Sequence, residues 1–270
     1  MGNYWSSAHS PDDLLPLQRK YGWRPDLPDH RDLLFKFNEE VFDRNLEHVD
    51  HRNQCPPVFD QGSLGSCTAQ SLATAYLFDE MKQENADTFT PSRLFIYYNE
   101  RSVEGTTDID NGASIRDGIK SINKTGVCHE SLWPYDVSKF AQTPPSICYQ
   151  DAKEHKSLKY YRIKQRRSQL KSALQTGYPV VCGIAVYESM ETPHVAETGL
   201  VSMPEENEKL LGGHCIVLVG YDNEKKLWLF RNSWGSSWGN EGYGYLPYQY
   251  LSNRTKLASD FWIIQTVTRE

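Results

Sequence analysis

The sequence lacks the features that mark membrane, secreted and nucleic-acid-binding proteins. No apolar run approaches the roughly 20 residues that a helix needs to cross a bilayer, and residues 1–10 lack the basic and apolar regions of a secretory signal. Basic residues are not in excess, since 29 Lys and Arg stand against 35 Asp and Glu, a net charge of -6. This balance disfavours binding to nucleic acid or anionic membranes. We expect a protein that binds no nucleic acid, has no membrane span and is cytoplasmic or packaged without secretion.

Cysteine is also sparse. The six cysteines of this 270-residue chain include no CxxC pair and no tight spacing, so neither a zinc site nor a disulfide scaffold is predicted. We expect no metal and no cofactor, and most thiols should be buried. The hydrophobic content of 39% is enough for a sizeable core, as one large domain or two modest subdomains.

Composition and hydrophobic periodicity divide the chain into three regions. Residues 1–44 are rich in proline and charge and predict an extended arm with room for one short helix. Residues 45–157 carry mainly helical periodicity. Residues 158–270 carry short β-prone runs bounded by glycine, asparagine and aspartate. We therefore predict an arm, a mainly helical lobe and a mainly β lobe.

Individual elements can be predicted within these lobes. An apolar stripe after Ser66, with Ser66 as N-cap, predicts a helix with one buried face. Further helices are predicted at 91–100 and 114–125, the latter ended by Gly126. Strands are predicted at the apolar runs 178–186, 215–219 and 226–230. Residues 193–209 are expected to form a long acidic loop.

The surroundings of Cys67 suit a nucleophile. A thiol attacks an acyl carbon as thiolate, and a helix N-terminus with a nearby imidazolium lowers a cysteine pKa enough to supply one at neutral pH. Cys67 stands in the first turn of the helix predicted after Ser66. The preceding turn contains two glycines, which let the backbone approach a substrate and leave the Cys67 N–H free. Gln61 would add a side-chain donor to the same oxyanion hole.

His214 is the predicted base and Asn232 its orienter. His214 follows two glycines and precedes an apolar run, so a rigid strand would present its imidazole from one end. Asn232 lies one strand later and can accept a hydrogen bond from the imidazole, which sets its tautomer, while Trp234 shields that bond from water. The predicted catalytic set is Cys67, His214, Asn232 and Gln61.

Three segments make the sequence resemble the papain-like cysteine peptidases. They are 61–68 (QGSLGSCT), 213–221 (GHCIVLVGY) and 231–239 (RNSWGSSWG). The resemblance implies an α+β fold of two lobes, a helical left lobe and a β-barrel-like right lobe, with the active-site cleft between them. It also implies a cysteine-type peptidase, with endopeptidase as the default, that hydrolyses polypeptides through a thioester acyl-enzyme.

The resemblance implies substrate-binding residues as well. Asn111 and Gly112 match the segment that hydrogen-bonds the substrate backbone on the non-prime side, and Trp238 matches the aromatic floor of the prime side. Gly213 and Trp234, beside the base and its orienter, belong to the same expected set. Asp260 falls where the family has the residue at the bottom of its main specificity pocket. An inward-pointing Asp260 would favour basic P2 residues.

Three positions depart from the family pattern. Leu64 stands in place of a disulfide cysteine, Thr68 in place of the tryptophan after the nucleophile, and Ala113 in place of a glycine of the substrate-binding pair. The core disulfide is therefore absent, as expected in a reducing compartment. Two alternative functions stay open. One is an acyltransferase or transglutaminase-like enzyme that uses the same triad, and the other is a non-catalytic binding module on a peptidase scaffold.

The arm corresponds to a short prosegment in this comparison. Residues 1–44 are expected either to inhibit the enzyme from within or beside the cleft, as in a zymogen, or to brace the outside of the lobes permanently. The first residues fit the N-myristoylation pattern, with Gly2 as acceptor, and an unmodified terminus is the alternative.

Overall fold

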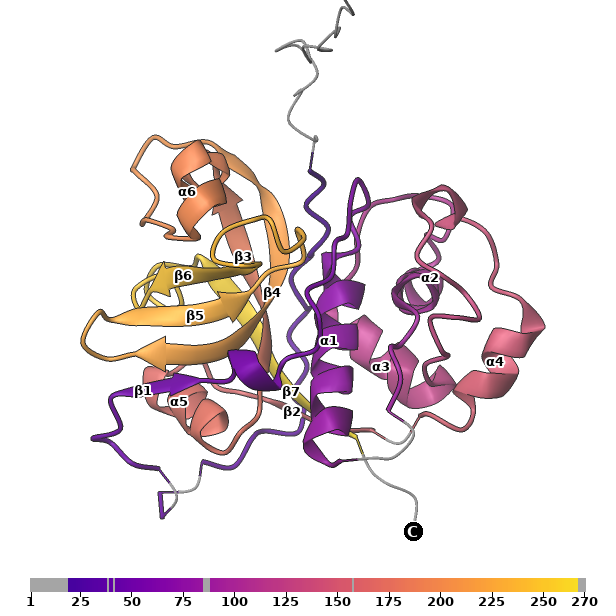
Figure 1. The fold of residues 1–270 in the computed structure, drawn as a ribbon, viewed down its shortest axis with the longest axis horizontal. Helices are drawn as coiled ribbons and strands as arrows, with labels where there is room; N and C mark the ends of the chain where they lie inside the picture. The colour runs from indigo at the N-terminus through magenta and orange to yellow at the C-terminus, as the bar shows by residue number, and fades with distance from the viewer. Residues whose placement is uncertain (1–18, 38, 41, 85–87, 157, 267–270) are drawn as a thin grey trace, which may run out of the picture.

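The structure is a computed structural model that describes residues 19–37, 39–40, 42–84, 88–156 and 158–266. Helices gather in one lobe and strands in the other, and the arm, coloured indigo, runs between them (Figure 1). The predicted α+β architecture of two lobes is confirmed. No helix among the described residues is long and apolar enough to span a bilayer. Gly2 lies outside the described residues.

The helical lobe is built around α1 (Cys67–Lys82), which begins at the predicted nucleophile. Residues 67–79 are all buried, because α1 packs against α2 (Arg93–Glu104) and α3 (Ile115–Thr125) and against strands of the other lobe. This burial on all sides exceeds the single buried face that the apolar stripe predicts. Helix α4 (Ser146–Ala152) and the short 3-10 helices η2 (Arg52–Gln54) and η3 (Val137–Lys139) complete the lobe.

Local capping sets the ends of the helices. Ser92 and Ser114 cap α2 and α3 by accepting hydrogen bonds from backbone N–H groups in the first turn. Gly126 ends α3 as predicted, with φ at 90°, in the region that favours glycine. Ser66 precedes α1 but makes no capping hydrogen bond, and its hydroxyl bonds Tyr135 Oη at 2.5 Å instead. The predicted cap at Ser66 is therefore wrong in its chemistry, although the predicted start of the helix is right.

The other lobe is a sheet in which all strand pairs are antiparallel, in the order β2-β7-β3-β4-β5-β6, with β1 also paired to β4. The predicted strands at 178–186, 215–219 and 226–230 are confirmed as parts of β3, β4 and β5. The strands are β1 (His48–Asp50), β2 (Leu158–Arg162), β3 (Val180–Tyr187), β4 (Leu210–Asp222), β5 (Leu227–Arg231), β6 (Tyr243–Pro247) and β7 (Ala258–Thr266).

The sheet lobe also contains helices, and one of them corrects the prediction of a long loop at 193–209. Helix α6 (Pro193–Thr198) forms there because Thr192 accepts a hydrogen bond from Val195 N–H, Pro193 suits the first turn, and Gly199 ends the helix with φ at 70°. The acidic composition of the segment concealed these local signals. Helices α5 (Arg167–Gln175) and η4 (Glu188–Glu191) lie in the same lobe.

The arm is extended over its described residues 19–37 and contains no helix there. It pairs with the body through two isolated parallel bridges, Trp23 with Ala113 and Leu34 with Arg162. The arm thus touches both lobes, because Ala113 precedes α3 and Arg162 ends β2.

Candidate active site

Cys67 is the first residue of α1 and is fully buried. The turn before it is held by hydrogen bonds of its own backbone, since Leu64 N–H donates to Gln61 O at 3.3 Å and Gly62, with φ at 56°, donates to Asp60 Oδ1 at 2.8 Å. Gln61 N–H in turn donates to Ser233 O at 2.9 Å, which ties this turn to the sheet lobe. The nucleophile helix is therefore joined to the segment that carries Asn232.

The Gln61 side chain is buried and oriented from both ends of its amide. Its Oε1 accepts a hydrogen bond from Ser233 Oγ at 2.8 Å, so its Nε2 faces the other way and donates to Leu64 O at 2.8 Å and Lys20 O at 3.2 Å. Lys20 belongs to the arm. The Gln61 side-chain amide thus donates a hydrogen bond to a backbone carbonyl of the arm.

His214 and Asn232 form a buried pair on β4 and just after β5. His214 Nε2 lies 2.8 Å from Asn232 Oδ1, which also accepts from Ser233 N–H at 2.9 Å. Because an amide oxygen only accepts, Nε2 carries the proton. His214 Nδ1 is buried and has no hydrogen-bond partner among the described residues. The imidazole therefore keeps an unprotonated nitrogen for another group, as the sequence predicts for a base held by Asn232.

Two tryptophans cover this pair. Trp234 stacks on His214 with ring centroids 4.7 Å apart and planes at 26°, and Trp238 stands edge-on to Trp234 at 5.1 Å. Both are buried, and Trp238 also packs against Phe230 of the sheet-lobe core. Trp234 thus shields the His214–Asn232 bond, as predicted, and its other face carries the guanidinium of Arg19 from the arm at 4.1 Å.

One short stretch of the arm, residues 20–23, contacts Cys67, Gln61 and His214 or their immediate neighbours, and its Tyr21 ring also meets Trp234 edge-on, near Asn232. The Gly22 backbone amide lies near enough to the Cys67 thiol to lower its pKa. Lys20 O accepts from the Gln61 amide, and the Tyr21 ring lies edge-on to His214 with centroids 6.3 Å apart. Trp23 N–H donates to Gly213 O, beside His214, at 2.9 Å. Because one extended stretch reaches all of them, these groups border a single site in the seam between the lobes.

The arm fits this seam through glycines. A Cβ at Gly22 would lie 1.7 Å from Gly65 O, and a Cβ at Gly112 would lie 1.7 Å from Gly22 O. The backbones of the arm and the body therefore approach more closely than any side chain permits. Ala113 N–H donates to Gly22 O at 2.8 Å, and Arg24 N–H donates to Ala113 O at 3.1 Å. The substitution of glycine by Ala113 leaves this backbone pairing intact.

Trp23 is the arm residue most deeply seated in the body. Its indole is 8% exposed and lies on the backbone of Gly183 and Gly213, where a Cβ would come within 1.8 Å and 2.8 Å of the ring. The two glycines lie on the neighbouring strands β3 and β4, where Gly183 pairs with Cys215 and Gly213 pairs with Ala185. No local pattern predicts this position of Trp23, because it depends on the missing side chains of two glycines that are distant from it in the sequence.

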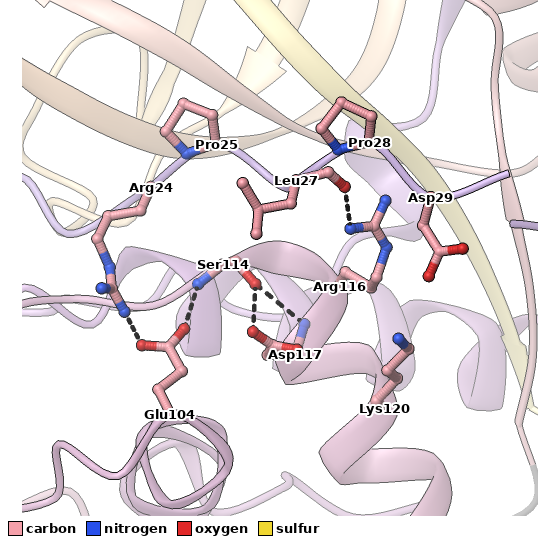
Figure 2. A pocket seen from close by; sticks show the side chains of 10 residues that line it. All are labelled: Arg24, Pro25, Leu27, Pro28, Asp29, Glu104, Ser114, Arg116, Asp117 and Lys120. Carbon is pink, nitrogen blue, oxygen red and sulfur yellow. Dashed lines mark hydrogen bonds and ion pairs between the residues drawn. The ribbon is translucent and has the colours of Figure 1, made fainter. Parts of the chain in front are cut away.

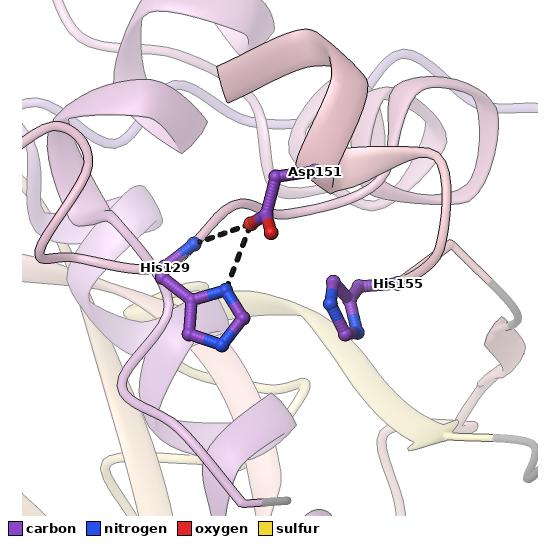
Figure 3. Close-up of side chains that lie close together, drawn as sticks. All are labelled: His129, Asp151 and His155. Atoms are coloured by element: carbon purple, nitrogen blue, oxygen red, sulfur yellow. Dashed lines mark hydrogen bonds and ion pairs between the residues drawn. The ribbon is translucent and has the colours of Figure 1, made fainter. Parts of the chain in front are cut away.

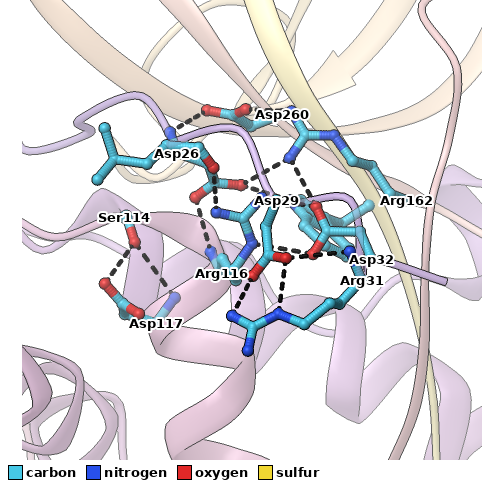
Figure 4. A network of polar contacts seen from close by, with 11 residues as sticks. Asp26, Asp29, Arg31, Asp32, Ser114, Arg116, Asp117, Arg162 and Asp260 are labelled. Atoms are coloured by element: carbon cyan, nitrogen blue, oxygen red, sulfur yellow. Dashed lines mark hydrogen bonds and ion pairs between the residues drawn. The ribbon is translucent and has the colours of Figure 1, made fainter.

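A second contact of the arm is a buried ionic network (Figure 4). Arg116 of α3 makes a bidentate ion pair with Asp32, at 2.6 and 3.0 Å. Arg162 reaches Asp26, Asp32 and Asp260, the last at 2.7 Å. Since Asp26 and Asp32 belong to the arm and both arginines to the body, the network fixes the arm to both lobes.

Asp260 is a member of this network. It is buried with φ at 57°, and its carboxylate accepts from Arg162 and from Asp26 N–H at 2.7 Å. Asn111, another predicted substrate-binding residue, is exposed, whereas its neighbour Gly112 is buried under the arm. The structure thus brings Gly112 and Gly213 to the seam with the triad, and sets Asp260 beside the arm at residue 26.

Beyond Trp23 the arm lines one side of a cavity of about 350 Å³, and α2 and α3 line the other side (Figure 2). Arg24 of the arm pairs with Glu104, and Glu104 also accepts from Ser114 N–H at 3.0 Å. Leu27 contributes its carbonyl to Arg116 at 2.5 Å while its side chain stays exposed. The arm is therefore held by backbone and charge along this stretch more than by apolar burial.

The covering arm changes the acid–base chemistry of the site. Burial raises the pKa of Cys67 to about 11, although hydrogen bonds from the Cys215, Gly22 and Thr68 amides oppose it. Burial lowers the pKa of His214 to about 4, although the Asn232 hydrogen bond opposes this change. With the arm in place, the thiol and the imidazole are both neutral near pH 7.

The departures from the family pattern have structural explanations. All six cysteines are free thiols, and Leu64 is buried in the core in place of a disulfide cysteine. Thr68 donates a hydrogen bond at 2.6 Å to Glu100, a fully buried carboxyl whose pKa burial raises to about 8. The residue after the nucleophile thus satisfies a buried acid of α2, a partnership that the sequence does not reveal.

Comparison with known proteins supports the same family. A family model described as papain family cysteine protease matches residues 46–261. An uncharacterized peptidase C1-like protein of Acanthamoeba polyphaga mimivirus is 44% identical over 95% of this chain and 90% of its own length. Cysteine proteinase 1 of Entamoeba histolytica is 25% identical over 71% of this chain, which spans 60% of that protein.

Solved structures agree. Xylellain, a cysteine protease from Xylella fastidiosa, superposes with a TM-score of 0.85 at 41% identity and covers 92% of this chain and 96% of its own. The digestive procathepsin L 3 of Tenebrio molitor larval midgut superposes with a TM-score of 0.66 at 20% identity, covering 88% of this chain and 75% of its own. At that identity the second likeness concerns the fold alone.

Proposed function

Because the chain belongs to the papain family of cysteine proteases, we propose that it cleaves peptide bonds within polypeptides, with Cys67, His214, Asn232 and Gln61 as its catalytic residues. The observation that carries the proposal is the stretch 20–23 of the arm, which lies along Gln61, Cys67 and His214, and His214 in turn is bonded to Asn232. An extended polypeptide that displaced the arm would meet the same groups.

In the proposed mechanism His214 Nδ1 takes the proton of the Cys67 thiol, and the resulting thiolate attacks the peptide carbonyl carbon to form a tetrahedral intermediate. The Gln61 amide, which donates to Lys20 O in the arm-covered form, would donate to the oxyanion together with the Cys67 N–H. His214, held through Nε2 by Asn232, uses Nδ1 to protonate the leaving amine. The thioester then reacts with water, from which His214 takes a proton, and the acid and the free thiol are released.

We propose that the arm inhibits the enzyme until it is displaced or removed, as in a zymogen. Two observations support this role. The backbone amide of Gly22 acts on the Cys67 thiol, so the backbone of the arm lies beside the proposed nucleophile. The arm also buries the thiol and the imidazole, which disfavours the ion pair that the attack requires. The contacts of Trp23 and the network around Asp32 would hold it in place.

The substrate specificity and the cellular location of the protein are further parts of the proposal. We propose that Gly112, Gly213, Trp234 and Trp238 border the bound substrate, and that Asp260 favours a basic P2 side chain once Asp26 has left. Asp260→Ala would leave the P2 preference unchanged if this is wrong. Asn111, exposed beside Gly112, would contact the substrate only at its edge. The expected cytoplasmic or packaged location is likewise a proposal.

Product analysis tests the proposed reaction. A chain starting at Asn45 should hydrolyse an internally quenched peptide at an internal bond, and an added primary amine should not change the products. Cys67→Ser should abolish the reaction, whereas Cys55→Ser, which alters a half-buried thiol outside the site, should not. Transfer of the acyl group to the amine would indicate the acyltransferase alternative. Absence of any turnover would indicate the binding module.

A further inference from the structure

A second cluster of reactive side chains lies in the helical lobe, outside the proposed active site. Within the described part of the chain, His129, Asp151 and His155 each offer one ligand atom, and these atoms all lie within 4.8 Å of one another. Figure 3 shows the three side chains turned toward a common space. Asp151 is at the end of α4, His155 follows it, and His129 comes from the segment after α3.

The backbone holds these three residues in position. His129 pairs with Pro91 in an isolated bridge, and its N–H donates to Asp151 Oδ2 at 3.0 Å. His155 N–H donates to Ala152 O at 3.1 Å, and His155 O accepts from Val127 N–H at 3.2 Å. The ligand-bearing segments are therefore cross-linked by hydrogen bonds without any ion, and the side chains have little freedom to separate.

An aromatic ring orients the imidazoles. Phe89 stacks on His129 with centroids 3.8 Å apart and planes at 21°, and it meets His155 edge-on at 4.5 Å. The two imidazoles are nearly perpendicular to each other, at 77°. Packing of this kind fixes ring planes, which is what a preorganised metal site requires.

Charge and access also suit a cation. Asp151 brings a carboxylate to the cluster, and the carboxylates of Glu80 and Glu154 also act on His155. The side chains of His129 and Asp151 are 36% and 21% exposed, so an ion and a water molecule can enter. The cluster is thus acidic, partly open and built from the ligand types that zinc takes.

We propose that His129, Asp151 and His155 bind a divalent transition-metal ion of the zinc type, with water as the fourth ligand. Two imidazoles and one carboxylate form a three-residue set of the kind that zinc uses, with ligand bonds of roughly 2.0–2.2 Å. The three atoms, which lie within 4.8 Å of one another, would draw closer together on binding to reach such bonds. His129 would bind through Nδ1, which now lies 2.8 Å from Asp151 Oδ2, with its proton moved to Nε2.

The bound ion would fasten α4 to the segments that carry Phe89 and His129. The sequence pattern did not predict it, because the ligands come from two segments separated by a long stretch of chain. This site is independent of the peptidase proposal, since no catalytic residue takes part in it.

The test uses the full chain carrying Cys67→Ser, so that the catalytic thiol cannot hold metal. After incubation with excess zinc chloride and gel filtration, we expect about one zinc per chain by atomic emission. With cobalt chloride, we expect the intense visible absorption of a tetrahedral ion without a thiolate charge-transfer band. His155→Ala and the near-isosteric Asp151→Asn should each weaken zinc binding by at least about 10-fold.

His194→Ala is the matched control, because His194 is exposed and distant in sequence from the cluster; it should bind zinc as the parent does. Zinc should raise the thermal midpoint of the parent and of this control but not of the two cluster variants. Circular dichroism without metal checks that each variant folds, and Asp151→Asn serves if His155→Ala does not. No retained zinc in the parent, or equal zinc in parent and cluster variants, would overturn the proposal.

Discussion

At the scale of single residues, the environment of Cys67 and His214 decides whether the site can react. Both side chains are fully buried beneath the arm, and burial opposes the charge that each must carry during the attack. The hydrogen bond that His214 donates to Asn232 favours the imidazolium, but burial outweighs it. Under the proposed mechanism this pair is inactive beneath the arm and can be activated once the arm has left.

The ionisation of Cys67 should follow the arm. In the full chain, alkylation of Cys67 by iodoacetamide should be slow at pH 7 and rise steadily toward the thiol pKa of about 11. In a chain starting at Asn45, water and the imidazolium should stabilise the thiolate, so the rate profile should shift to lower pH. Stopped-flow rates with Cys67→Ser subtracted as background measure this. Identical profiles for the two chains would contradict the account.

Asn232 should matter through the orientation of His214. In the arm-free chain, Asn232→Ala should lower kcat/KM on the order of 10²-fold, because the base loses the bond that sets its tautomer. Asn253→Ala, at an exposed position, is the control and should leave the rate unchanged. Equal rates for Asn232→Ala and the parent would show that the pair has no catalytic role.

Residue chemistry explains which of these groups could be predicted from sequence. Cys67, Gln61, His214 and Asn232 stand among glycines and tryptophans in a distinctive order, so the local pattern was sufficient to propose them as the catalytic set. Glu100 was not predictable, because its partner Thr68 comes from another helix and its burial results from packing. The packing of Trp23 was not predictable either, because its ring lies on glycines of two paired strands that are distant from it in the sequence.

At the scale of elements, the arm behaves as an additional extended segment inserted between the lobes. Its backbone bonds Gly213 on one side and Ala113 on the other, and its position depends on close backbone approach at Gly22. Composition alone was enough to predict that the arm is extended. The route of the arm along the body could not be predicted, because contacts with both lobes determine it. Helix α6 shows the reverse case, where local caps existed but acidic composition masked them.

Substitution at Gly22 should release the arm. A Cβ there would lie 1.7 Å from Gly65 O, so Gly22→Ala should weaken arm binding and raise the activity of the full chain at least about 10-fold, toward that of the arm-free chain. Leu33→Ala, on an exposed arm side chain, is the control. Initial rates on a quenched peptide measure the effect. A full-length Gly22→Ala as inactive as the parent, beside an active arm-free chain, would sink this docking mechanism.

At the scale of the whole molecule, helix α1 joins the lobes because it packs on helices of one and strands of the other. Its buried partner Glu100 makes overall stability depend on pH. The folded-state pKa of about 8 exceeds the ordinary value of 4.5, so the folded protein binds the proton more tightly than the unfolded chain. The stabilisation is present below about pH 4.5 and is lost as pH rises to about 8.

This dependence can be measured by urea unfolding. One pKa unit corresponds to about 1.4 kcal/mol, so we expect the free energy of unfolding to fall by at least about that much between pH 5 and pH 8. Glu100→Gln, which stays neutral, should remove most of the fall, whereas the exposed Glu224→Gln should keep it. A Glu100→Gln profile parallel to that of the parent would contradict the assignment.

The central claim is that Cys67 is the nucleophile of a site that the arm covers. The most direct test is to treat the full chain and the chain starting at Asn45 with a peptidyl epoxide that traps active papain-like thiols, and to map the adduct by mass spectrometry. The account predicts one adduct per chain, on Cys67, formed at least about 10-fold faster without the arm because the thiolate becomes accessible. No adduct at Cys67 in the arm-free chain, or an adduct on another cysteine, would contradict it.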